Sequence, residues 1–140
     1  MPIYNIYLFN RKGLLLYYRE WKRDRQNGMD RSEEGKLFFG MLLSLKSFAE
    51  RMSSREGYQT IRFFKTSAYK CSYLESPTGL IFALNAHPEA HGGNELLQEI
   101  YKLYVDTVIK NPLANPEDPI DNELFTTRLD AIVTKHSAFA

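Results

Sequence analysis

A hairpin with two unequal arms constrains the fold of this chain more than any other stretch. It turns at Ser76-Pro77-Thr78-Gly79, where proline presets φ for the second turn position and glycine accepts a positive φ. A type I turn followed by a glycine bulge fits these four residues. The arm Tyr69–Tyr73 alternates bulky and polar side chains, whereas Leu80–Leu84 is apolar throughout. We therefore expect the second arm to be covered on both faces, in a sheet with material packed on each side.

Three more strands are expected. Ile3–Phe9 is apolar on both faces, which is typical of a central strand, and strict alternation puts Ile3 on the same face as Tyr7 and Phe9. The turn signal Asn10–Gly13 leads into a second strand at Leu14–Tyr18. The remaining strand, Gln59–Lys65, has an edge-like pattern, with Ile61 and Phe63 on one face and Thr60 and Arg62 on the other.

A long helix is predicted from about Asp30 to Met52. Asp30-Arg31-Ser32-Glu33 resembles a capping box, with Asp30 as the cap and Ser32 as the alternative. Gly40 lies in mid-helix, where glycine costs about 1 kcal/mol relative to alanine, and it indicates a position that another backbone approaches. Two interpretations remain for the wide apolar surface of this helix. It is either fully buried within its own domain, or it packs one face on its own sheet and another on a partner subunit, which we favour for so small a domain. The residues expected to lie between the sheet and the partner are Phe38, Phe39, Leu42, Leu43 and Leu45.

Two further helices complete the pattern. Asn94–Lys110 ends before Pro112, because the residue that precedes a proline avoids helical geometry. Asp121 or Asn122 can cap the last helix. The apolar stripe of the first of these helices comprises Leu97, Ile100, Tyr101, Tyr104, Val105 and Val108, and that of the second comprises Phe125, Leu129, Ile132 and Val133.

The composition and motifs favour a binding or scaffold role over an enzyme. A net charge of +1 gives no general attraction to nucleic acid or to a membrane, and a single cysteine excludes an internal disulfide. Cys71 is interpreted as a small buried hydrophobe, and no phosphate loop or nucleophile motif is present. His87 and His91 have helical metal-ligand spacing, but Pro88 disfavours a helix there. We therefore expect no catalytic, cofactor or metal site, in one domain spanning residues 1–140 without a signal peptide.

The charged stretch of residues 19–31 allows two interpretations. A solvated loop is the one we favour, because its five basic and three acidic residues nearly balance. The alternative is a basic patch for an anionic lipid or an acidic protein. Trp21 is expected to plug the exit of the preceding strand.

The order strand, strand, helix, three strands, helix, helix predicts an α+β fold. Its five-stranded antiparallel sheet would carry one helix on one face and two on the other. This order resembles the longin or SNARE-like fold. Within that group the chain is similar to the smallest, Bet-five-type core subunit of the TRAPP vesicle-tethering complex. The segments that carry the resemblance lie in order along nearly the whole chain: Tyr4–Gly13, Glu33–Leu42, Lys46–Phe48, Thr66–Lys70, Glu75–Gly79, Lys110–Leu113, Glu123–Phe125 and Arg128–Asp130.

The resemblance implies a non-catalytic subunit of an assembly. TRAPP acts in transport from the endoplasmic reticulum to the Golgi, and its small subunits together form a guanine-nucleotide exchange factor for a Rab GTPase. The implied partners are the sybindin-type and Bet-three-type subunits, with the Rab bound by the assembled complex. The implied location is cytoplasmic, peripheral on endoplasmic reticulum and cis-Golgi membranes, with no nucleic acid partner and no cofactor.

Two other functions are compatible with the same pattern. One is a small longin-like subunit of a clathrin-type adaptor complex, which would assemble around cargo signals. The other is an α/β module that senses a small molecule, which would require a sizeable internal apolar cavity.

Overall fold

The computed structural model describes residues 3–21, 31–52, 63–110, 119–120 and 122–137. Its strands form one antiparallel sheet in the order β2-β1-β5-β4-β3. The strands are β1 (Ile3–Phe9), β2 (Leu15–Glu20), β3 (Phe63–Lys65), β4 (Lys70–Glu75) and β5 (Ile81–Ala86). The helices are α1 (Arg31–Met52), α2 (Gly93–Tyr104), which continues into the π-helical turn η1 (Val105–Ile109), and α3 (Glu123–Ser137).

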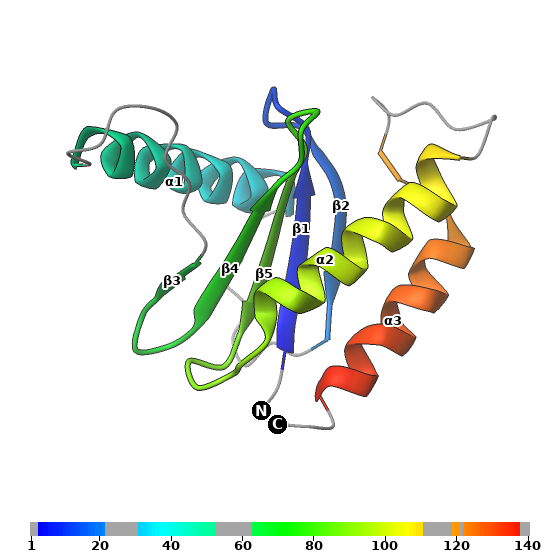
Figure 1. The fold of residues 1–140 in the computed structure, drawn as a ribbon. Helices are drawn as coiled ribbons and strands as arrows, with labels where there is room; N and C mark the ends of the chain where they lie inside the picture. The colour runs from blue at the N-terminus through cyan, green and yellow to red at the C-terminus, as the bar shows by residue number, and fades with distance from the viewer. Residues whose placement is uncertain (1–2, 22–30, 53–62, 111–118, 121, 138–140) are drawn as a thin grey trace.

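The layers are those predicted. Figure 1 shows α1 on one face of the sheet and the pair α2 and α3 on the other. The predicted α+β, longin-like order of elements is thus confirmed. Of the predicted strand Gln59–Lys65, the described residues include Phe63–Lys65. Of the predicted capping box, they include the residues that follow Asp30.

Strand β5 lies at the centre of the sheet, between β1 and β4, and all six of its residues are buried. Its side chains alternate between the two cores. Ile81 and Ala83 face α1, whereas Phe82 and Leu84 face α2 and α3. The continuous apolar arm of the hairpin therefore became the strand that needs cover on both faces, as predicted.

The turn that precedes β5 has the predicted geometry. The Gly79 N–H donates to the Ser76 carbonyl at 3.0 Å, and the Ser76 N–H donates to the Leu80 carbonyl at 2.8 Å. Gly79 has a φ of +91°, which is the left-handed conformation that a glycine bulge requires. The Ser76 hydroxyl also accepts from the Leu80 N–H at 3.0 Å, so the turn is fixed by its own side chain.

Three details of the strands differ from the sequence-based expectation. Ile3 packs with Ile6 and Leu8, not with Phe9, because the β1–β5 register shifts between Ile3 and Asn5. Arm β4 is more buried than its alternation suggested. Its Ser72 is only 5% exposed, because the start of α2 covers it.

In β3, the side chain that packs inward is Phe64, whereas Phe63 is 51% exposed. Phe63 pairs with Ser72 and so lies on the α2 face of the sheet. At this edge strand the ring is covered mainly by the Lys70 ammonium, 4.5 Å from its centre.

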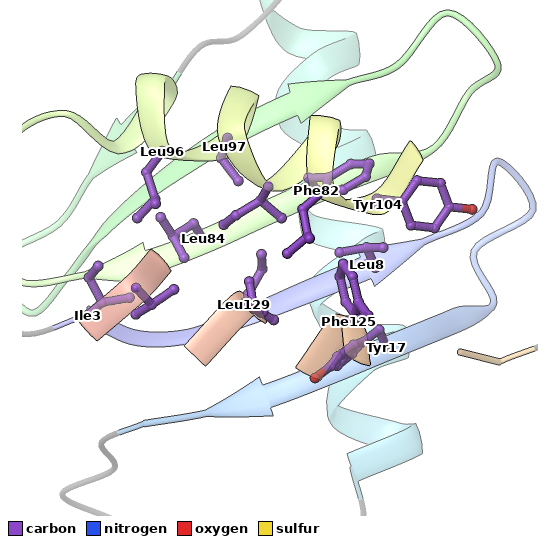
Figure 2. Packing of buried hydrophobic residues seen from close by; sticks show 14 of the residues in the cluster. Ile3, Leu8, Tyr17, Phe82, Leu84, Leu96, Leu97, Tyr104, Phe125 and Leu129 are labelled. Atoms are coloured by element: carbon purple, nitrogen blue, oxygen red, sulfur yellow. The ribbon is translucent and has the colours of Figure 1, made fainter. Parts of the chain in front are cut away.

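The core between the sheet and the helix pair is aromatic at its centre (Figure 2). Tyr17 of β2, Phe82 of β5, Tyr104 of α2 and Phe125 of α3 make tilted or edge-on ring contacts with centroid separations of 5.0–6.4 Å. The predicted stripes of both helices are confirmed as buried or partly buried, and α2 adds two buried leucines that the prediction omitted, Leu96 and Leu103.

Side chains from distant parts of the chain fasten α3 and the turn η1. Asn122 caps α3, because its Oδ1 accepts from the Phe125 N–H at 3.1 Å, and its Nδ2 donates to the Thr107 carbonyl at 3.0 Å. On β2, the Leu16 carbonyl accepts from the Ile120 N–H at 2.7 Å. The segment that leads into α3 is thereby tied to the outermost strand.

Substitution of Gly79 tests the turn. Gly79→Ala should lower the free energy of unfolding by about 1–2 kcal/mol, because a Cβ is strained at this φ and would lie 3.0 Å from Arg11 Cβ. Urea unfolding followed by circular dichroism measures the change. Lys12→Ala, in the neighbouring exposed turn, serves as the control and should change stability little; an unchanged midpoint for Gly79→Ala would contradict the turn assignment.

Candidate protein-interaction surface on helix α1

Helix α1 is attached to the sheet by stacked aromatic rings. The Phe38 ring lies 4.6 Å from the Tyr7 ring at an interplanar angle of 16°, and Tyr7 stacks in turn on Phe9. Phe39 reaches the Phe9 ring at 5.3 Å and covers the β1–β2 turn, where a Cβ on Gly13 would collide with it. Phe38 and Phe39 are thus both used largely within this chain.

Two polar contacts fix the direction of α1 across the sheet. The Tyr7 hydroxyl donates to Glu34 Oε1 at 3.0 Å near the start of the helix. Further along, Lys46 Nζ bonds both Glu75 carboxylate oxygens, at 3.1 and 3.3 Å, and both side chains are about three-quarters buried. A partly buried pair of this kind is screened less by salt than a surface pair. The outward face of α1 is therefore held in one orientation.

One flank of that outward face is apolar. Four residues recur at helical spacing and form the outer stripe: Leu37, Met41, Phe48 and Met52. Leu37, Phe48 and Met52 are 62%, 63% and 69% exposed. Contiguous exposed apolar side chains of this size mark interaction surfaces in soluble domains.

The five residues predicted to lie between sheet and partner are divided by the structure. Leu42 is buried against the sheet, and Phe38 and Phe39 are partly buried in the same cluster. Leu45 is intermediate in exposure, at the border of the outer stripe, and Leu43 is exposed on the opposite flank of the helix. The most exposed apolar residues of α1, by contrast, were not among the five. A helical wheel reveals them once Leu42 is known to mark the inward direction.

Gly40 lies on the outer surface of α1 between these two flanks. A Cβ built at Gly40 would meet no atom within 4 Å. Nothing within the described chain therefore requires a glycine here. Ser44 and Ser47 follow on the same exposed side and, with Leu43 and Phe48, line a shallow groove.

The charged stretch predicted as a loop begins inside β2, because Arg19 and Glu20 belong to that strand. It contributes less free charge than its sequence suggests. Arg19 forms two hydrogen bonds to the Asp130 carboxylate, at 2.7 and 3.1 Å, and this pairing raises the pKa of the guanidinium. Trp21 donates its indole N–H to the same carboxylate at 3.0 Å and packs on the core, so its predicted role as a plug is confirmed. Residues 22–30, which would carry the alternative basic patch, lie outside the described part of the chain.

The remaining candidates for chemistry have structural roles or no ligand set. Cys71 is fully buried, and burial raises the pKa of its thiol to about 12. Within the described ranges, no three His, Cys, Asp or Glu side chains are grouped closely enough to hold a metal ion. In that same part of the chain, no helix combines the length and apolar character needed to cross a bilayer.

Comparison with known proteins decides the family. The profile of the Sybindin-like family matches residues 3–136 of the 140. This chain belongs to the Sybindin-like family. The resemblance to the small TRAPP subunits is thereby confirmed.

The relatives of this Sybindin-like chain are named as subunits of one complex. A human protein named trafficking protein particle complex subunit 1 is 41% identical over 134 residues, which cover 95% of this chain and 92% of that protein. The fission yeast transport protein particle subunit bet5 is 29% identical over 157 aligned positions, covering 99% and 100%. A Dictyostelium discoideum protein named trafficking protein particle complex subunit 4 is 31% identical over 135, covering 95% and 97%. Two kinds of subunit of that complex thus share this fold.

The single thiol tests the burial of β4. At pH 8, Ellman's reagent should label native Cys71 at least about a hundredfold more slowly than the chain unfolded in urea, because the side chain is buried and burial raises the pKa of its thiol to about 12. Because the native pKa is raised, stability should be intact below pH 9 and decline as the pH rises towards 12. Cys71→Ala should weaken that decline. Rapid labelling of the native protein would contradict the burial of Cys71.

Proposed function

We propose that this chain is a non-catalytic subunit of the TRAPP tethering complex and joins it through the outer face of α1. The observation that carries the proposal is the outer stripe, an exposed apolar surface on a helix that is fixed from behind. The family supports the kind of assembly, because relatives that align over nearly this whole chain are named as subunits of the trafficking protein particle complex.

The outer stripe has the energetic content of an interface. Burying one large apolar side chain contributes about 1.5–3 kcal/mol, so three largely exposed residues can supply several kcal/mol on association. Interfaces of permanent complexes are apolar in this way. Since α1 is already fastened by Phe38 and by the Lys46–Glu75 pair, little order has to be gained on binding.

The partner on α1 is proposed to be a second subunit of the Sybindin-like family, with a Bet-three-type subunit also bound to the chain. One family profile covers this chain, and a relative named as subunit 4 aligns with it nearly end to end. A partner of the same fold would present a comparable helix with an apolar outer face. Close packing of two helices is favoured where one of them carries glycine or serine, as this chain does at Gly40, Ser44 and Ser47.

Nucleotide exchange on a Rab GTPase is proposed as an activity of the assembled particle, in transport from the endoplasmic reticulum to the Golgi. An assembly accelerates exchange by binding the nucleotide-free GTPase more tightly than the nucleotide-bound form, which requires no bond chemistry from this chain. The proposed location is cytoplasmic, with peripheral attachment to endoplasmic reticulum and cis-Golgi membranes through the complex.

Substitutions on the two flanks of α1 test where the partner binds. Phe48→Glu should reduce co-purification of the other small subunits about tenfold or more, because the partner would have to bury an unpaired charge. Leu43→Asp tests the opposite flank. Leu124→Glu on α3, which replaces a side chain of similar exposure, is the matched control and should retain the α1 partner. Full co-purification by folded Phe48→Glu and Leu43→Asp variants would contradict an α1 interface.

Gly40 offers a test in which stability and assembly change in opposite directions. In the isolated chain, Gly40→Ala should raise the free energy of unfolding by up to about 1 kcal/mol, because the new Cβ lies in open space and alanine favours helix. In the complex, the same methyl should weaken binding if a partner backbone approaches there. A variant that is stabilised and assembles normally would remove Gly40 from the interface.

A further inference from the structure

Figure 1 shows that α2 begins and α3 ends at the same end of the sheet. Residues from β4, the start of α2 and the end of α3 line a pocket there. It has a volume of about 360 Å³ and an apolar floor that includes Ile3 and Leu84. Its rim carries side chains that can donate hydrogen bonds, from three separate elements: Lys70 and Ser72 of β4, His91 before α2, and His136 of α3. It lies on the face of the sheet opposite to α1, so the proposed subunit interface does not account for it.

Ser72 is the feature of this pocket that the fold leaves unused. Its side chain is 95% buried and lines the pocket, and its hydroxyl has no hydrogen-bond partner among the described residues. The hydroxyl lies against Gly93, the first residue of α2, where a Cβ would collide with it. The hydroxyl is therefore free to bond water or a ligand in the pocket.

The start of α2 adds backbone donors beside that hydroxyl. Its cap, Gly92, has a φ of +77° and provides no side-chain oxygen, so it does not satisfy the N–H groups of Gly93 and Asn94. The positive end of the helix dipole strengthens these groups as donors to an anion. Lys70 supplies a full positive charge at the rim, held there by a 3.3 Å hydrogen bond to the Ala90 carbonyl.

Two carboxylates near the pocket have basic side chains beside them. Glu89 lines the rim but accepts from Lys65 at 3.2 Å, and this hydrogen bond lowers the pKa of Glu89. Glu99 lies 3.7 Å from His136 Nε2. Glu95, in the first turn of α2, is also near, since its carboxylate lies 4.0 Å from where a Cβ on Gly92 would be, but its side chain is exposed to solvent.

We propose that this pocket binds a phosphate monoester. Ser72, the first N–H groups of α2 and the Lys70 ammonium supply three kinds of donor to one pocket, which suits the three terminal oxygens of a phosphate better than the two oxygens of a carboxylate. The apolar floor has room for a small organic substituent on the fourth oxygen. Such a monoester exists both in soluble metabolites and in lipid headgroups, and the two sources are separated by experiment.

The test measures binding of glycerol 3-phosphate to the full chain by NMR titration, in parallel with sedimentation on vesicles with and without phosphatidylinositol 4-phosphate. Binding in either arm, with shifts centred on Gly93 and Asn94 in the soluble arm, supports the site and identifies the source. Ser72→Ala and Lys70→Gln should each weaken binding about tenfold, the effect of losing one hydrogen bond to a charged group.

Two controls keep the result specific. Lys12→Gln makes the same charge change in the β1–β2 turn and should leave binding unchanged. Ser72→Ala should leave the thermal midpoint of the free protein nearly unchanged, because no hydrogen bond within the described fold uses this hydroxyl. The proposal fails if neither probe binds, if Lys12→Gln weakens binding as much as Lys70→Gln, or if Ser72→Ala destabilises the free protein and thus shows that the hydroxyl serves the fold.

Discussion

The burial of β5 on both faces is the constraint on which this structure depends. A strand with Ile81 and Ala83 on one side and Phe82 and Leu84 on the other cannot leave either side to water. One helix covers the first side and two cover the second, and each helix takes its inward direction from this strand. The aromatic stack under α1 and the ring cluster between α2 and α3 both follow from that requirement.

Most of the fold was predictable because its signals are local. The turn Ser76–Gly79, the apolar arm after it and the stripes of the helices each lie within a short stretch of sequence. Errors arose where a distant element decided the outcome. The register shift after Ile3 is set by pairing with β5, and the burial of Ser72 is set by the start of α2, about twenty residues later.

The candidate surface was predictable in outline and not in detail. The sequence indicated that α1 carries more apolar surface than one sheet can cover, but the direction of Leu42 had to be known before Leu37, Phe48 and Met52 could be placed outward. The pocket at the start of α2 was not predictable at all. Its donors come from β4, the loop before α2 and the end of α3, and no sequence spacing links Ser72 with Gly93 or His136.

The hydrogen bond from the Ile120 N–H to the Leu16 carbonyl has a consequence for how such sheets can grow. It occupies β2 on the side away from β1, where a strand from another molecule would otherwise add. Edge-to-edge addition is thereby favoured at β3, the other edge strand of the sheet. Two molecules joined through one edge each form a closed pair, and a chain built in this way cannot continue into a filament.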